Sequence, residues 1–261
     1  VDTDGSFEIF VDPNSAKDKK NHIQTSAGAK EFYIRDTMID WLNDRPNLLD
    51  IEIIPSSRAD KKLDAKMRLE IVKNYMHKWA ANTTRWNQQA LSKPVNEFSF
   101  KIDRDTDGAL RNQVYLLGHF ALPSFDHCIK LDVFLDGAKY FIAPITNIWG
   151  TTNNIVSKNG SLNNAQSKIN ADGTYTFILS VNDPGNFNWL DPSNLTEGIL
   201  TLRWSGFPNE VVGKNLYVKS TLMLTSDALK EVDENHITSS MERESQLEQR
   251  RESYSWRTEL N

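Results

Sequence analysis

Hydrophobic and polar residues alternate in short segments along most of the second half of the chain. The clearest of them, residues 129–135, reads IKLDVFL and places charged residues between apolar ones. Similar segments occupy residues 96–100, 113–122, 140–145, 173–181, 198–204 and 216–224. Alternation with a period of two is typical of strands with one buried face. Strands this short, separated by turn signals such as Asp136-Gly137, predict an antiparallel β-sandwich or jelly roll.

A helical period occurs between residues 58 and 91. Apolar residues recur there at steps of three and four, namely Leu63, Met67, Ile71, Val72, Tyr75, Met76, Trp79 and Trp86. Pro94 follows and stops a helix. Charged residues fill the opposite face, so the segment is predicted to be an amphipathic helix that packs on a sheet or on a neighbouring helix.

The C-terminal segment, residues 227–261, is rich in charge. Helix-capping residues at 226–227 precede it, and residues 242–251 carry both signs of charge along one face. This pattern predicts either a solvated helix or a docking tail. A docking tail would need apolar anchors, for which the candidates are Leu247, Tyr254 and Trp256.

A segment near the N-terminus is repeated in the second half of the chain. DGSFEIFV at residues 4–11 matches DGTYTFIL at residues 172–179, 168 positions later. Two further matches follow at nearly the same offset: NHI at 21–23 with NWL at 188–190, and Phe32, Ile34 and Arg35 with Leu200, Leu202 and Arg203. Each copy is therefore predicted to have an Asp-Gly turn, a strand, a long loop and a return strand.

We interpret the repeat as two related β-modules, of which the first lacks its leading strands. The sequence starts at Val1 without an initiator methionine, a basic leader or an apolar signal core, as though in the middle of a domain. Residues 31–43 are predicted to be mostly helical after a short extended piece. The predicted organisation is a partial first β-module at 1–57, a connecting amphipathic helix at 58–94, a complete β-sandwich module at 95–225 and a charged helix or tail at 226–261.

Composition excludes several classes of protein. The 261 residues are 39% apolar and 10% aromatic, which is enough to form a hydrophobic core. With a mean hydropathy of −0.53 and no run of about eighteen apolar residues, no membrane-spanning helix is expected. The net charge of −5 and pI near 5.6 argue against a nucleic-acid-binding surface. Cys128 is the single cysteine, so no internal disulfide supports the fold, and we expect this thiol to be buried and inert.

Residues 161–204 carry a set of closely spaced short motifs. In order they are SLNNAQ at 161–166, DG at 172–173, DPG at 183–185, NWLD at 188–191 and RW at 203–204. Through these motifs, together with Gly118-His119 and Trp149, the chain resembles the bacterial family catalogued as domain of unknown function number 1214 (DUF1214), and looks like the C-terminal part of a longer member. The resemblance implies a β-sandwich of jelly-roll type, often assembled into oligomers, with no settled activity. One departure is Asn164, where many relatives carry histidine.

Four residues are candidates for catalysis. Asp183 and Asp191 flank a tight loop and would form a carboxylate pair of the kind that glycosidases use. Together with His119 and Arg203 they would suit a hydrolase or a lyase. The alternative is that both aspartates form turns with their own backbone and that the arginine makes a structural ion pair. The five histidines show no spacing typical of zinc ligands, so neither a metal nor a cofactor is expected.

Side-chain amides and indoles are the candidates for ligand binding. Uncharged amides beside exposed indoles suit the recognition of a sugar ring or another small polar ligand. The candidates are Trp149, Asn163, Asn164, Gln166, Asn188, Trp189 and Asp191. Alternatively the amides brace long loops, because buried amides must find partners. Trp204, in phase with its strand, is expected in the core.

Two functions remain open from the sequence. The first is a β-sandwich binding or assembly module whose 147–191 loops bind a small polar or carbohydrate-like ligand, and which forms homo-oligomers or associates with a missing N-terminal region. The second is an enzyme, a hydrolase or lyase that uses the carboxylate, histidine and arginine candidates. No nucleic-acid partner is expected, and the sequence does not decide between a cytoplasmic and an exported protein.

Overall fold

The chain divides into two compact units in the computed structural model, Val1–Thr37 and Met38–Asn261. The structure describes residues 1–17, 19–29, 31–54, 63–98 and 113–255. The division falls after Thr37, ahead of the boundary expected at residue 57. Within the described ranges, neither the long helix of the second unit nor any other helix combines the length and hydrophobicity that crossing a bilayer demands.

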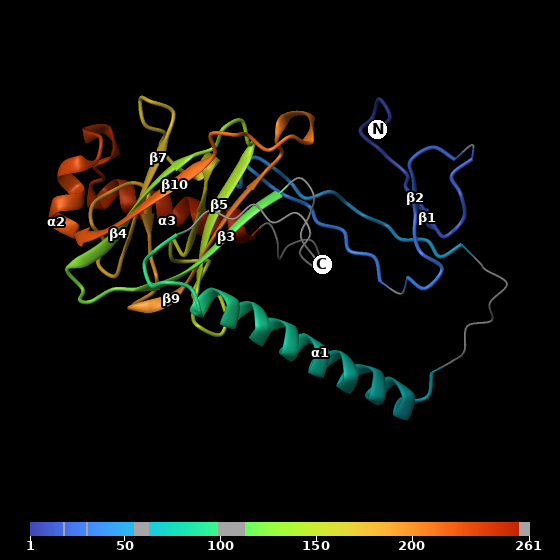
Figure 1. Ribbon diagram of the computed structural model, residues 1–261. Helices are drawn as coiled ribbons and strands as arrows, with labels where there is room; N and C mark the ends of the chain where they lie inside the picture. The colour runs from blue at the N-terminus through green and yellow to red at the C-terminus, as the bar shows by residue number, and fades with distance from the viewer. Residues whose placement is uncertain (18, 30, 55–62, 99–112, 256–261) are drawn as a thin grey trace. The chain divides into compact units, whose positions relative to one another are not determined.

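The second unit contains a β-sandwich of two four-stranded sheets (Figure 1). One sheet has the strand order β10-β4-β7-β8, and the other has the order β3-β9-β5-β6. The strands are β3 (Gln113–Ala121), β4 (His127–Phe134), β5 (Tyr140–Thr146), β6 (Ser161–Asn163), β7 (Tyr175–Ser180), β8 (Trp189–Leu190), β9 (Glu197–Ser205) and β10 (Tyr217–Leu224). Neighbours pair antiparallel except β7 and β8, which are parallel. The predicted mainly β sandwich is confirmed. Of the predicted strand at 96–100, residues 96–98 are not in a strand, and residues 99 and 100 lie outside the described residues.

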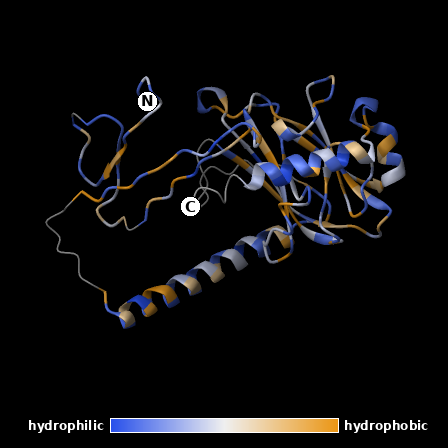
Figure 2. Cartoon of the chain, turned by 180° about the vertical axis from the view of Figure 1, so that it is seen from behind, coloured by the Kyte–Doolittle hydropathy of each residue, from blue (hydrophilic) through white to orange (hydrophobic). Residues whose placement is uncertain are grey.

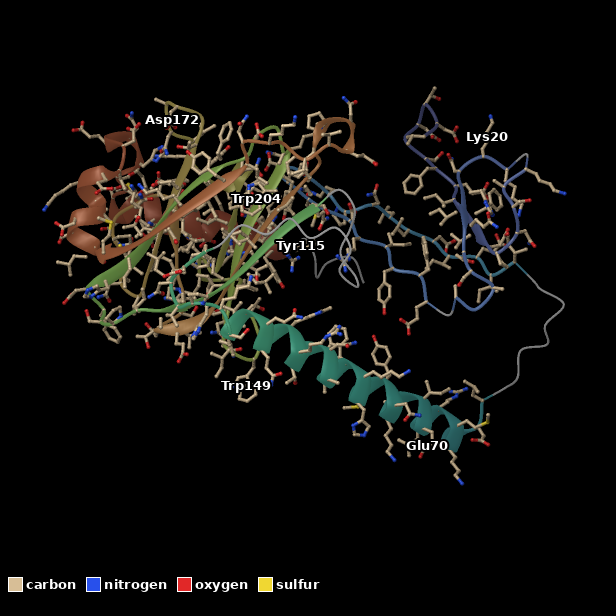
Figure 3. The ribbon with its side chains drawn as sticks, viewed as in Figure 1. Lys20, Glu70, Tyr115, Trp149, Asp172 and Trp204 are labelled. Atoms are coloured by element: carbon tan, nitrogen blue, oxygen red, sulfur yellow. The ribbon has the colours of Figure 1, made fainter. Side chains whose placement is uncertain are left out.

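A single hydrophobic core joins the two sheets. Phe141 on β5 and Phe177 on β7 come from different sheets, and their ring centroids lie 5.6 Å apart. The indole of Trp204 on β9 lies 5.1 Å from the Phe141 ring (Figure 3). All three side chains are fully buried. Aromatic pairs at these separations add to the stabilisation from area burial, and the expected core position of Trp204 is confirmed.

The predicted turn at Asp136-Gly137 is present but does not close a hairpin. Both residues have positive φ, 43° and 86°, and the N–H of Ala138 donates to the carbonyl of Leu135 at 2.9 Å. These features are typical of a tight two-residue turn. It connects β4 to β5, which belong to different sheets. The turn therefore passes the chain from one layer of the sandwich to the other.

The outer face of the β10-β4-β7-β8 sheet is covered by a short helix, α2 (Thr225–Ala228), and the 3-10 turn that follows it (Leu229–Glu231). Cys128 and Ile178 pack there against Ala228 and Val232. Burial raises the pKa of the Cys128 thiol to about 11. The expectation that Cys128 is buried is confirmed.

We predict that the native protein resists modification of Cys128 by a thiol reagent at pH 8. Its thiol is buried and its raised pKa leaves little reactive thiolate at that pH. Absorbance of the released chromophore should show full modification only in about 6 M guanidinium. An Ala171→Cys variant, whose new thiol lies in an exposed turn, is the control and should react before unfolding. Equal rates of thiol modification in the native wild-type protein and in the native Ala171→Cys variant would contradict the prediction.

Helix α1 (Ala65–Leu91) precedes the sandwich and contacts β3 and β9 of the second sheet. Asp64 caps its first turn by accepting the N–H of Met67 at 2.8 Å. Ala90, near its C-terminus, is its buried residue. Its apolar stripe is exposed instead, with Val72, Met76 and Trp79 all at least 52% accessible, and Figure 2 shows hydrophobic residues mainly in its N-terminal half. The expectation that this stripe packs on a sheet or helix is therefore wrong for the described residues, and residues 58–62 of the predicted helix lie outside them.

The first unit holds two short strands, β1 (Phe10–Asp12) and β2 (His22–Gln24), which pair in parallel. Residues 31–43 contain neither the predicted helix nor the predicted return strand; they have no regular secondary structure up to residue 38 and then turn at 39–43. Asp40 and Asp44 explain the turn, because their carboxylates accept N–H groups of nearby residues and so compete with helical hydrogen bonds. Pro46 follows directly and disfavours helix continuation.

Candidate functional site

The candidate site lies where helix α3 (Ser240–Ser255) packs on the SLNNAQ segment of the second unit. Arg250 makes the main contact. Its guanidinium donates to the carbonyl of Ile155 at 2.6 Å, to the carbonyl of Ser161 at 2.8 Å and to the Ser161 hydroxyl at 3.0 Å. It also lies 5.0 Å from the Trp41 ring centroid. A guanidinium supplies several donors in a fixed plane, so one buried side chain satisfies two loop carbonyls.

Arg243 fixes the other part of α3. Its Nε donates to Asp183 Oδ2 at 2.8 Å, and its guanidinium lies 5.1 Å from the ring centroid of Trp189. Both arginines are buried, whereas Leu247 and Tyr254, the predicted apolar anchors, are only partly buried. Trp256 lies outside the described residues. The described part of the C-terminal segment is thus docked mainly by charge-assisted hydrogen bonds from its two buried arginines.

A pocket of about 260 Å³ opens beside this contact. Loops at 40–42, 159–168 and 187 form it together with α3. We call it the α3 pocket; it is lined by Asp40, Trp41, Leu42, Asn159, Leu162, Ala165, Gln166, Ser167, Lys168, Phe187, Gln246, Gln249, Arg250 and Ser253. A wider hollow of about 590 Å³ in the first unit is lined, among the described residues, by one exposed loop, at residues 14–17 and 19. The α3 pocket is the better candidate because separate segments of the chain converge on it.

Asn159 lines the α3 pocket and carries a buried acceptor without a partner. The residue is 1% exposed, and its Nδ2 donates to Gln246 Oε1 at 2.8 Å. Its Oδ1 has no hydrogen-bond partner among the described residues. A buried acceptor without a partner is costly, so such atoms call for an explanation.

The charged side chains of the α3 pocket are already engaged by the protein. Lys168 donates to the carbonyl of Asn235 at 2.7 Å and lies 4.7 Å from the ring centroid of Phe187. The side chain of Asn43 lowers the pKa of Asp40 below its usual value by donating a hydrogen bond to the carboxylate. With Arg250 bound to loop carbonyls, the groups left for a ligand are mainly amides and rings.

The SLNNAQ residues brace the fold. Asn163 caps a 3-10 turn, η1 (Asn164–Gln166), by accepting the N–H of Gln166 at 2.9 Å, while Gln166 Oε1 accepts the N–H of Asn163 at 3.1 Å. Asn164 accepts the N–H of Phe141 at 2.9 Å and donates to the carbonyl of Lys139 at 3.2 Å. Gln166 alone of the three also lines the α3 pocket. The bracing alternative therefore describes Asn163 and Asn164.

Asn188 and Trp189 are also structural. The Asn188 side chain is fully buried and bonds the backbone of Lys168 and Thr176. Trp189 is 6% exposed, and its indole N–H donates to the carbonyl of Ser180 at 2.9 Å. The expectation that Trp189 stacks on a ligand is therefore wrong, because its ring faces are covered. Trp149 is 74% exposed (Figure 3) but does not line the α3 pocket.

The four candidate catalytic residues do not form one site. Asp183 pairs with Arg243, whereas Asp191 lies 3.2 Å from Lys158 Nζ and accepts the N–H of Ser193 at 2.7 Å. The other two candidates have separate partners, His119 with Glu197 at 2.8 Å and Arg203 over the ring of Tyr115. Within the described residues, no hydrogen bond or ion pair joins any two of the four. The same ranges contain no group of three or more His, Cys, Asp or Glu that could hold a metal ion.

Comparisons with known proteins add partial structural likenesses. No protein-family model matches the chain, and no curated protein matches it. A solved structure of an uncharacterised protein from Burkholderia cenocepacia is 20% identical with a TM-score of 0.49, covering 56% of this chain and 39% of that one. A protein from Vibrio parahaemolyticus is 16% identical with a TM-score of 0.35, covering 43% of this chain and 31% of that one. The chain thus spans about two fifths of the length of the Burkholderia protein.

Proposed function

We propose that the chain is a β-sandwich binding module that holds a small, uncharged, hydroxyl-bearing ligand of carbohydrate-like chemistry in the α3 pocket. The main support for this proposal is Asn159 Oδ1, a buried acceptor without a partner that a ligand hydroxyl would satisfy. In this proposal the ligand lies between the SLNNAQ segment and α3, and the SLNNAQ segment is part of the 147–191 loops from which binding was expected.

The lining chemistry supports an uncharged ligand. Side-chain amides of Gln166, Gln246 and Gln249 surround the pocket, and Trp41 and Phe187 supply aromatic surface. Amides offer both donors and acceptors, which matches hydroxyl groups. The cationic groups are bound to backbone carbonyls, so they offer little to an anion.

The volume supports a small ligand. Pockets for drug-sized molecules usually measure roughly 300–1,000 Å³, and the α3 pocket measures about 260 Å³. One sugar ring or a polyol fits this size better than an oligosaccharide. Assembly into oligomers, which the resemblance to DUF1214 implies, stays part of the proposal and is supported by the exposed apolar stripe of α1.

A thermal-shift screen of monosaccharides, disaccharides and polyols tests the ligand class. We expect a monosaccharide or polyol to raise the Tm of the wild-type chain and to bind Asn159→Leu roughly tenfold more weakly, because the ligand hydroxyl then loses its buried acceptor. Gln249→Ala, on the exposed side of the pocket, is a second variant that leaves the buried residues intact. Trp149→Ala is the matched control and should keep full affinity.

Three results would contradict the proposal. One is the absence of any stabilising compound in the screen. Another is equal affinity of every hit for the wild type, Asn159→Leu and Gln249→Ala. The third is tighter binding of a sugar phosphate than of the same unphosphorylated sugar, since that would identify an anion site.

A further inference from the structure

The same closed turn occurs at residues 2–6 of the first unit and at residues 170–174 of the second. In each, the aspartate side chain accepts the N–H two residues later at 2.9 Å. The glycine N–H donates to the carbonyl three residues earlier at 3.0 Å, and the glycine φ is +87° in one copy and +84° in the other. The match in sequence is thus also a match in backbone hydrogen bonding.

The same strand pairing follows each turn. In the first unit Phe10 pairs in parallel with His22, and in the second Ile178 pairs in parallel with Trp189. These are equivalent positions of the repeat. In both copies the first of the pair donates its N–H to the carbonyl of the residue before its partner, at 3.0 Å and 3.1 Å. The first unit therefore reproduces the β7–β8 part of the sandwich.

The equivalent apolar side chains differ in burial. In the second unit they are Tyr175, Phe177, Leu179 and Leu190, each at most 8% exposed in the core. In the first unit they are Phe7, Ile9, Val11 and Ile23, which are 38–47% exposed. We call these four the unit-1 face. Residues that form a core in one copy form an exposed apolar surface in the other, which marks an interaction site.

The second unit shows what flanks this position within its own sheet, while the opposite sheet covers the face, as Phe141 does for Phe177. Strand β4 pairs antiparallel with β7 and places Ile129, Leu131 and Val133 opposite the three core residues of that strand. In the first unit, β1 has β2 as its partner among the described residues. We propose that the unit-1 face binds an extended polypeptide strand, antiparallel to residues 7–12, with apolar residues at alternate positions as in β4. Backbone hydrogen bonds to the free edge would give affinity, and the apolar positions would fix the register.

The charge of Glu8 in the first unit indicates which type of residue the partner strand should carry opposite it. Glu8 occupies the place of Thr176, whose hydroxyl donates to Asp132 of β4 at 2.8 Å. A second carboxylate opposite Glu8 would be repelled, whereas a lysine or arginine would be attracted. The partner strand should therefore carry a cationic residue where β4 carries Asp132.

Two synthetic peptides test the proposal on the full chain. Both carry residues 126–136 with Cys128→Ser, and one also carries Asp132→Lys. Hydrogen exchange read by mass spectrometry should show protection of residues 7–12 on addition of either peptide. The lysine peptide should bind roughly two- to fivefold more tightly. A Val11→Lys variant should lose the protection, and Ile53→Lys, a change at another exposed apolar residue, should keep it.

Several outcomes would overturn the proposal. One is no protection of residues 7–12 with either peptide, and another is the same protection in Val11→Lys as in the wild type. Protection confined to residues 175–180 would mean that the peptide replaces β4 in the second unit. A dimer of the peptide-free chain by light scattering, abolished by Val11→Lys, would identify a second copy as the occupant.

Discussion

Replacing Trp189 with alanine is expected to lower the free energy of unfolding of the second unit by about 3–5 kcal/mol. Its ring is 6% exposed, its indole N–H bonds the carbonyl of Ser180, and the guanidinium of Arg243 covers it at 5.1 Å. The substitution removes a large buried side chain and leaves that carbonyl without its indole donor. Urea unfolding followed by circular dichroism measures the loss.

Trp149→Ala is the matched control for this change. Trp149 is 74% exposed, so its loss should change the free energy of unfolding by less than about 0.5 kcal/mol. Comparing the two variants separates an effect on stability from an effect on ligand binding, because both tryptophans were predicted from the sequence to contact a ligand. If Trp189→Ala unfolded at the wild-type urea midpoint and lost ligand binding, the ring would be a binding surface after all.

The strands of the second unit were predictable because their burial follows local sequence. Residues 129–133 alternate between apolar and charged side chains, and β4 spans His127–Phe134. A strand whose two faces meet different surroundings must alternate in this way, so the pattern reports the structure directly. The repeat was readable for the same reason, since Asp-Gly turns demand the same backbone in both copies.

The secondary structure of residues 31–43 was not predictable from the hydrophobic period alone. Their apolar residues fit a strand and a helix about equally, and the prediction chose the helix. The structure forms a turn there, because the carboxylates of Asp40 and Asp44 bond backbone N–H groups close to them. Such bonds depend on side-chain geometry, which a hydrophobic period does not contain.

For the apolar stripe of α1, the sequence predicted the helix correctly but not the exposure of its apolar residues. Its three- and four-residue spacing correctly predicted a helix, and Asp64 and Pro94 lie at its ends. The same spacing also predicted burial, yet Val72, Met76 and Trp79 are exposed. Periodicity shows which residues share a face of a helix, but it does not say whether the described part of the chain covers that face.

The candidate site was located in part. The amide-rich SLNNAQ segment does border a pocket, but most of its amides hold the loop in place. The sequence analysis did not identify the wall of the α3 pocket that α3 forms, about eighty positions further along the chain. One signal was available: Arg243 and Arg250 are seven residues apart, so a helix presents both on one face. Buried arginines break the rule that apolar residues form the inner face, which is why Leu247 and Tyr254 were chosen instead.

Replacing Arg250 with methionine is expected to release α3 from the SLNNAQ segment and to cost about 2–4 kcal/mol. Methionine keeps much of the side-chain volume but removes the donors that bind the carbonyls of Ile155 and Ser161. Those carbonyls would then have to face water, which requires the helix to move away. Hydrogen exchange should show α3 amides losing protection before the sandwich strands do.

Arg251→Met is the control for this last change. Arg251 is 41% exposed and pairs with Glu248 one turn away, so its loss should cost less than about 1 kcal/mol. Because α3 forms one wall of the pocket, Arg250→Met should also abolish the Tm increase caused by any compound that binds there, while Arg251→Met should preserve it. Loss of protection in α3 with an unchanged ligand response would instead place the ligand outside the α3 pocket, on loops that the sandwich holds without the helix.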